Sequence, residues 1–176
     1  TTKFMKCKSF FWLVAISILA ISCNEFDDGS YVAPITIYEK VNGEWSLMNL
    51  KMVDEYAKLN AIEPSEQNLS AMFNYEDFKL KLNVDENMNP TSYEVIGNVP
   101  PLFPPKGFWA LSSPFQQTDA SATKIYLYKD AQKTEMTDEL RLTSVPGSNG
   151  EMEIQLIRVS GGAAFVSYIF KLKATN

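Results

Sequence analysis

The sequence predicts an all-β domain, most simply an eight-stranded up-and-down antiparallel barrel. Apolar and polar residues alternate with a period of two, as in 78–84 (Phe-Lys-Leu-Lys-Leu-Asn-Val) and 151–156 (Glu-Met-Glu-Ile-Gln-Leu). This period indicates strands with one face in a core. Turn-forming residues such as Asn42-Gly43 and Gly161-Gly162 interrupt the pattern at short intervals. Closing consecutive antiparallel strands into a barrel removes exposed edges, and a two-sheet β-sandwich is the alternative.

Eight strands fit between the turn signals. They are expected near 43–53, 75–84, 91–97, 107–112, 123–130, 137–145, 151–160 and 163–173. A barrel of about eight strands has an interior just wide enough for packed side chains or for one small ligand. The strand count therefore allows a filled barrel as well as a ligand carrier.

Two connections differ from tight turns. The first, 54–74, is long, and its part from Asn68 to Phe73 is expected to form a short helix capped by Asn68 or Ser65. The second, 99–105, reads Val-Pro-Pro-Leu-Phe-Pro-Pro. Four prolines exclude a ladder strand and favour a stiff extended crossing.

The segment 1–22 differs from the rest of the chain. Lys3, Lys6 and Lys8 precede an apolar run at 10–21 that is shorter than the roughly 20 residues a membrane-spanning helix needs. A basic start followed by a short apolar core describes a secretory signal peptide. We therefore expect a signal peptide at 1–22, a flexible tether at 23–38 and a single β-domain at 39–176.

The residues around Cys23 indicate a lipid anchor. Leu19-Ala20-Ile21-Ser22-Cys23 resembles the lipobox of bacterial lipoproteins, in which the cysteine is acylated. The resemblance implies anchoring through lipid on Cys23, and two acyl chains hold a protein stably at a membrane. The acidic stretch 24–28 resembles a signal for export to the outer face of the outer membrane. The expected location is that of an outer-membrane lipoprotein facing the periplasm or the cell surface.

The charge balance argues against nucleic acid as a partner. The chain holds 16 basic and 21 acidic residues, and three of the basic ones precede Cys23. The processed chain would carry 13 minus 21, a net charge of −8. Such a surface repels polyanions. Cys7 leaves with the signal and Cys23 carries lipid, so the expected domain has no internal disulfide and depends on its core.

A short motif occurs twice, 64 residues apart. Gly43-Glu44-Trp45-Ser46-Leu47 and Gly107-Phe108-Trp109-Ala110-Leu111 both read G-x-W-x-L at the start of an expected strand. In each, the glycine is expected to permit a tight turn and the tryptophan to plug one end of the β-structure. Because successive strands reverse, Trp45 and Trp109 are expected at opposite ends of a barrel.

The first of these motifs resembles the G-x-W signature of lipocalins and related calycins. The stretches 89–100 and 106–111 look like an uncharacterised family of lipocalin-like outer-membrane lipoproteins, and this resemblance covers 39–174. It implies a calycin-like barrel and supplies no catalytic residues. Lipocalins also place a late arginine against the first-motif tryptophan, for which Arg158 is the candidate here.

The candidate ligand-binding residues surround the second motif. Trp109 is the proposed platform for a sugar or an apolar ligand, and Phe103, Phe108 and Phe115 lie near it in sequence. A proline-braced plug of packed aromatic rings is the favoured role for the same residues, and the ligand platform is the alternative. For Trp45 and Trp109, simple core packing is likewise favoured over a binding role.

The sequence lacks the residues on which several common classes of catalytic site depend. It contains no histidine, which excludes Ser-His and Cys-His nucleophilic sites and histidine-ligated metals. Acidic pairs such as Asp54-Glu55 and Asp138-Glu139 are expected at loops as solvated charges, and Asp85-Glu86-Asn87 with Asn89 is a weak calcium candidate. We therefore expect no enzyme activity, no cofactor and no metal.

Two functions of different classes remain. The first is a membrane-anchored lipocalin-like binding module for a small apolar ligand or a glycan. The second is a non-catalytic accessory or structural subunit of an outer-membrane assembly, with a filled barrel and an outer-membrane protein as partner. A carboxylate-dependent hydrolase is a distant third. A barrel interior with no void larger than a few waters would exclude the function of a ligand carrier.

Overall fold

A computed structural model describes residues 32–175, and those from Ile35 onward form one compact unit. The expected signal peptide, Cys23 and most of the expected tether lie outside the described residues. The elements in chain order are α2 (Ile37–Val41), β1 (Gly43–Asp54), α3 (Glu55–Leu59), β2 (Glu66–Asn68), the 3-10 turn η1 (Tyr75–Asp77), β3 (Lys79–Val84), β4 (Pro90–Ile96), β5 (Lys106–Leu111), β6 (Thr123–Tyr128), β7 (Met136–Ser144), β8 (Glu151–Ser160) and β9 (Ala163–Ala174).

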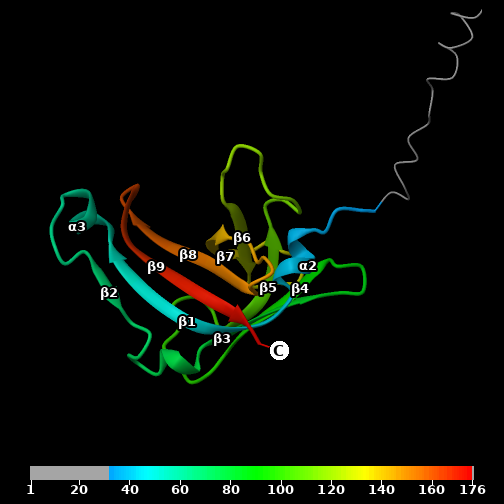
Figure 1. Cartoon of the computed structure of the whole chain (residues 1–176), viewed down its shortest axis with the longest axis horizontal. Helices are drawn as coiled ribbons and strands as arrows, with labels where there is room; N and C mark the ends of the chain where they lie inside the picture. The colour runs from blue at the N-terminus through cyan, green and yellow to red at the C-terminus, as the bar shows by residue number, and fades with distance from the viewer. Residues whose placement is uncertain (1–31, 176) are drawn as a thin grey trace, which may run out of the picture. The chain divides into compact units, whose positions relative to one another are not determined.

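The strands form a closed antiparallel barrel. The hydrogen-bonded order is β1-β3-β4-β5-β6-β7-β8-β9, and β9 pairs again with β1, from Trp45–Ala174 to Asp54–Val166. The short β2 adds to β1 outside this ring. Figure 1 shows the long curved β1, β8 and β9 side by side, with α2 and α3 at opposite ends of β1. The β1–β9 ladder confirms the predicted eight-stranded barrel and excludes the sandwich.

The strands lie within a few residues of the expected ranges, because the period-two pattern reports which face of each strand is buried. The largest difference is at β3, which begins at Lys79 because Tyr75–Asp77 form a 3-10 turn. The helix expected from Asn68 to Phe73 is wrong. Residues 66–68 pair with β1 instead, and the Asn68 carboxamide oxygen accepts a hydrogen bond from the Ser70 amide in a turn.

Two short helices were not predicted, because each contains only five residues. Each begins at a recognisable cap. Thr36 and Glu39 form a reciprocal capping box for α2, and the Asp54 carboxylate accepts a hydrogen bond from the Ala57 amide at the start of α3. Helix α2 starts two residues before the expected domain start, and its Ile37 is buried. The folded domain therefore begins two residues earlier than the sequence indicated.

Apolar side chains fill the barrel. The inward-facing residues of all eight barrel strands join one cluster, in which Trp109, Tyr93, Phe170, Leu50 and Ile154 are almost fully buried. Side chains from the loops complete it, including Phe78 and Phe103. The interior is thus packed rather than hollow.

Helix α2 closes the barrel at the start of β1. The Trp45 indole Nε1 donates to the Val41 carbonyl oxygen at 2.8 Å, and the Tyr38 ring packs on Trp109 with centroids 5.6 Å apart. The Tyr38 hydroxyl also accepts from the Leu111 amide. These contacts tie the helix to both G-x-W strands.

The two tryptophans therefore lie near the same end, and the prediction of opposite ends is wrong. The starts of β1 and β5 do lie at opposite ends, as the reversals require. Trp109, however, is the fourth residue of a six-residue strand. Its Nε1 donates to the Asn83 carbonyl oxygen at 2.9 Å, one residue past the Gly43–Leu82 pair. The indole thus reaches the α2 end from a strand that starts at the other end.

Candidate functional site

The end of the barrel away from α2 is covered by the proline-rich crossing. This segment, 97–105, joins the end of β4 to the start of β5, and we call it the lid. The Tyr75 hydroxyl donates to the Pro100 carbonyl oxygen at 3.1 Å, and the Tyr93 hydroxyl donates to that of Pro104 at 3.0 Å. Prolines supply no amide donors, so side chains and the Val95 amide hold the segment through its carbonyl groups.

Phe103 plugs the barrel beneath the lid. Its side chain is 5% exposed, and its ring lies 6.1 Å from that of Phe170, 6.4 Å from Tyr93 and 6.5 Å from Phe78 between centroids. The void that remains under the lid is about 40 Å³ in volume and is lined by Phe78, Phe103 and the lid prolines. A space of that size holds water rather than a ligand.

A larger hollow lies beside the lid, and we call it the mouth groove. Its volume is about 400 Å³. It is lined by Met52, Leu69, Met72, Phe73, Tyr75 and Tyr168, together with Gln67 and the lid residues Pro100 and Leu102. Met52 and Tyr168 are paired in register across β1 and β9, so the groove continues the inner face of the barrel.

The mouth groove combines apolar surface with a few polar groups. Met72 and Phe73 are exposed, and Phe73 has 66% of its surface open to solvent. Burial raises the pKa of the Tyr75 hydroxyl, and the neighbouring Tyr168 adds to the shift. The Tyr75 hydroxyl therefore stays protonated at neutral pH, so it offers a neutral hydrogen-bonding group beside methionine and aromatic side chains.

An ion pair faces the interior next to this groove. The Arg158 Nη1 contacts the Asp138 Oδ1 at 2.5 Å, and its Nη2 donates to the Leu102 carbonyl oxygen of the lid. Arg158 is paired in register with Val166, whereas Trp45 is paired with Ala174 at the other end of β9. Arg158 therefore does not make the lipocalin-type contact with the first-motif tryptophan.

Tyr93 should make the stability of the barrel depend on pH in the alkaline range. Burial raises the pKa of Tyr93 to about 12, and the negative charge of Asp138 adds to the shift. The unfolded chain loses this proton near pH 10 while the folded chain keeps it, so stability should fall as pH rises from 10 toward 12. Denaturant midpoints measured across that range should fall less steeply for Tyr93→Phe. Equal slopes in the two proteins would contradict the shift.

The sequence-predicted ligand residues do not converge on one site. Trp109 is 0% exposed and Phe103 is 5% exposed, and both contribute to the core. Phe108 points outward into a separate shallow hollow of about 520 Å³, with Asn83, Ser92 and Lys106 around it. Phe115 is 45% exposed in the loop next to Pro114, whose carbonyl oxygen accepts from the Ile37 amide at the α2 end.

The motif residues have structural roles that differ between the two copies. Gly43 has φ +121°, a value that favours glycine, so it allows the tight turn from α2 into β1. Gly107 meets a different demand: a Cβ there would lie 2.3 Å from the Tyr128 carbonyl oxygen. It is required for close approach of β5 and β6, and the expected tight turn applies to Gly43 alone.

The residues of the mouth groove were missed by sequence reasoning. They come from β1, β2, the connection 69–75, the lid and β9, and no local motif links these segments. One feature of the sequence did point to this groove. The connection contains Met72-Phe73 without a strand period, and apolar residues in a loop indicate a surface that contacts something else.

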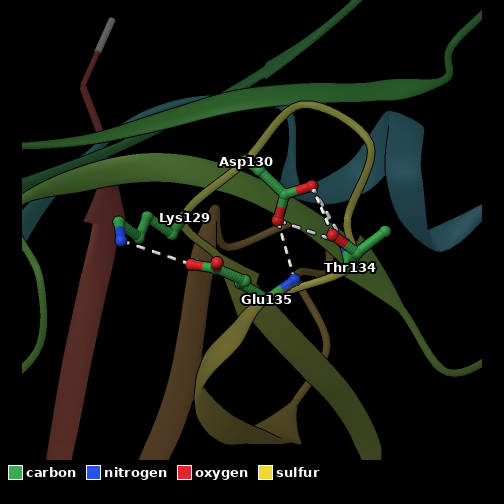
Figure 2. A network of polar contacts seen from close by, with 4 residues as sticks. All are labelled: Lys129, Asp130, Thr134 and Glu135. Carbon is green, nitrogen blue, oxygen red and sulfur yellow. Dashed lines mark hydrogen bonds and ion pairs between the residues drawn. The ribbon is translucent and has the colours of Figure 1, made fainter.

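Two of the acidic clusters serve loops, whereas Asp138 lies in β7 with its side chain only 7% exposed, so the solvated loop charge expected there is wrong. The Asp130 carboxylate accepts from the backbone amides of Thr134 and Glu135 and from the Thr134 hydroxyl, while Lys129 pairs with Glu135 at 3.3 Å (Figure 2). These bonds lower the pKa of Asp130. The Asp85 carboxylate accepts from the Asn87 and Asn89 amides in the same way. Within residues 32–175, no cluster of three acidic, histidine or cysteine side chains is arranged to hold a metal ion.

A family model described as a domain of unknown function, DUF5004, matches residues 21–173. The chain belongs to the DUF5004 family. No curated protein and no solved structure matches it. This DUF5004 domain consists of a packed barrel with a helix at one end and a lid with a groove at the other. Among the helices of residues 32–175, none is long and apolar enough to cross a membrane.

Proposed function

We propose that this DUF5004 domain is a lipocalin-like binding module that takes a small, largely apolar ligand in the mouth groove and acts without catalysis. The observation that carries the proposal is the groove itself, about 400 Å³ of mainly apolar surface next to a packed barrel. Ligand sites are typically concave and apolar, measure about 300–1,000 Å³ and contain a few polar groups that orient the ligand. Gln67, Tyr75 and Tyr168 supply such groups here.

The filled interior moves the proposed site from the centre of the barrel to its rim. Phe103 and Phe170 occupy the space that a central ligand would need. The groove needs no such displacement, because Met72 and Phe73 are already exposed. Methionine also adapts its shape to different apolar partners. The apolar form of the ligand therefore suits this site better than the glycan form, whose aromatic candidate Phe108 lies in a separate hollow.

The test uses the neutral apolar dye N-phenyl-1-naphthylamine with residues 32–176, a segment that closes its own barrel and core. We expect the dye to bind with increased fluorescence. Phe73→Ala should weaken binding about tenfold, or ~1.4 kcal/mol, with little loss of stability because Phe73 is exposed. Phe115→Ala is the matched control, an exposed phenylalanine at the other end. Equal effects of the two substitutions, or no dye binding, would count against the groove.

We also propose that the domain is held at the outer membrane through lipid on Cys23. The basic start, the apolar run and the residues around Cys23 support this. Changing Cys23 to Ala should abolish incorporation of labelled fatty acid in cells and release the protein from the membrane fraction. Changing Cys7 to Ala is the matched control and should leave both unchanged. Labelled fatty acid on the Cys23→Ala protein would show that the anchor assignment is wrong.

An accessory subunit is the second candidate, and the packed interior favours it. Three exposed apolar side chains lie on and just after α3, at Tyr56, Leu59 and Ile62, and Leu59 is 86% exposed. Such side chains suit contact with another protein. Crosslinking from Leu59 in cells tests this role: capture of one outer-membrane protein, lost in Leu59→Asp, would support the subunit. Free protein alone would exclude it.

A further inference from the structure

The mouth groove adjoins a charged group whose position is unusual. Along β8, Leu156 is buried in the core and Arg158 follows it on the same inward face. An inward-facing charge costs free energy unless it is paired. Arg158 is paired with Asp138, whose side chain is only 7% exposed, while its own side chain is 37% exposed. The arginine is therefore the solvent-facing member of the pair.

The pair spans an opening in the barrel wall. The β7–β8 ladder ends at the Leu140–Leu156 pair, and Asp138 and Arg158 lie beyond it. Their side chains bridge the separated strand ends beside a hollow of about 270 Å³. Glu139, which also lines this hollow, is engaged by Lys124 at 3.0 Å. Asp138 therefore provides the direct carboxylate contact to the guanidinium.

Stability alone does not account for this pair. Replacing a buried ion pair with apolar side chains is often neutral or stabilising, so the pair itself is weak evidence for a structural role. A guanidinium presents five N–H donors in a planar fork suited to carboxylates. Within residues 32–175, Arg158 makes hydrogen bonds to Asp138 and to the Leu102 carbonyl oxygen. The bond to the neutral Leu102 carbonyl is the one that a charged ligand at the rim can replace.

Leu102 connects the charge to the groove. Its carbonyl oxygen accepts from Arg158, and the same residue lines the mouth groove. Leu156 lines the hollow and is paired in register with Tyr168, which lines the groove. The apolar groove and the guanidinium thus lie on either side of one lid residue. An elongated molecule with an apolar body and a charged head would contact both.

We infer that Arg158 recognises an acidic head group, so that the ligand of the mouth groove is an amphiphilic carboxylate. The carboxylate binds the guanidinium in place of the Leu102 carbonyl, while the apolar body lies along Met72, Phe73 and Tyr168. Hydrogen bonds between two ionised groups are stronger than those to a neutral carbonyl. The exchange releases one of the bonds that hold the lid, so head-group binding loosens the lid. This inference rests on the proposed binding function.

The test compares two compounds with the same alkyl chain, decanoate and decan-1-ol, as competitors for the bound naphthylamine dye. We expect decanoate to displace the dye from residues 32–176 at about tenfold lower concentration. The double variant Asp138→Asn, Arg158→Met removes both charges without leaving one unpaired, and it should lose this preference. Arg158→Lys should retain part of it. Lys81→Met, a charge removed from the exposed face of β3, should retain all of it.

The outcomes separate this inference from the function on which it rests. Dye binding without a preference for decanoate overturns the inference and leaves the groove as a ligand site. A preference that survives in the folded double variant also overturns it. Absence of dye binding overturns the proposed function, and the inference with it. Amide hydrogen exchange at Leu102 and Phe103 should accelerate with decanoate and not with decan-1-ol, and equal rates would exclude release of the lid.

Discussion

Trp109→Ala should destabilise the barrel by ~3–5 kcal/mol, the range typical of a large buried aromatic residue. The side chain is 0% exposed, and it packs on Tyr38 while its Nε1 donates to the Asn83 carbonyl oxygen. Truncation leaves a cavity at the α2 end and removes one of the two hydrogen bonds to the Asn83 carbonyl oxygen, which keeps its bond from the Thr91 hydroxyl. Because domains of this kind are stable by about 5–15 kcal/mol in total, the loss would remove a large fraction of the stability. Urea denaturation of residues 32–176 measures it.

Two further variants identify which property of Trp109 accounts for the loss of stability. Trp109→Phe retains most of the apolar volume and loses the indole donor, so it should cost less than Trp109→Ala. Phe115→Ala removes a half-exposed ring in the loop at the same end and should change stability by less than about 0.5 kcal/mol. If Trp109→Ala cost below about 1 kcal/mol and instead abolished dye binding, Trp109 would act as a ligand platform and its structural assignment would be wrong.

Gly107→Ala should be the second most damaging substitution. A Cβ at this position would lie 2.3 Å from the Tyr128 carbonyl oxygen and 3.0 Å from the Tyr93 ring. The nearer contact is backbone, so β5 and β6 must separate, at a cost of about 1–3 kcal/mol or more. Thermal and urea denaturation should both show the loss.

Gly147→Ala is the matched control for this prediction. It adds the same methyl group in the β7–β8 turn, where the nearest atom is the Asn149 side-chain oxygen at 3.8 Å. This variant should be as stable as the parent protein. If the two alanine variants were equally stable, the close approach of β5 and β6 would not constrain position 107.

The strands were predictable because each carries its own evidence. The alternation in 78–84 and 151–156 indicates which face of each strand is buried, and the intervening turn residues indicate where each strand ends. The short helices were not predictable from a period, because α2 and α3 each contain five residues. Asn68 led to a wrong prediction of a helix, because the same residue type caps helices and forms turns. Its pairing with β1 places it at the end of β2, where its side-chain oxygen accepts from the Ser70 amide in a turn.

The candidate site was predictable only in part. The proline-rich crossing and its aromatic content were visible in the sequence, and the structure places Phe103 in the barrel as a plug. The role of Trp109 depended on how far along its strand the indole lies and which neighbour its Nε1 reaches. The pairing of Arg158 with Asp138 depended on the β7–β8 register. Neither is a local property of the chain.

The all-β class, the strands, the stiff crossing and the absence of histidine chemistry follow from the sequence, because side-chain period, proline content and residue type are local. Three features required the folded chain: the barrel is filled, both tryptophans lie at the α2 end, and a groove forms from Met52, Phe73, Tyr168 and the lid. These features depend on contacts between segments far apart in sequence, whose register is set when β9 closes on β1.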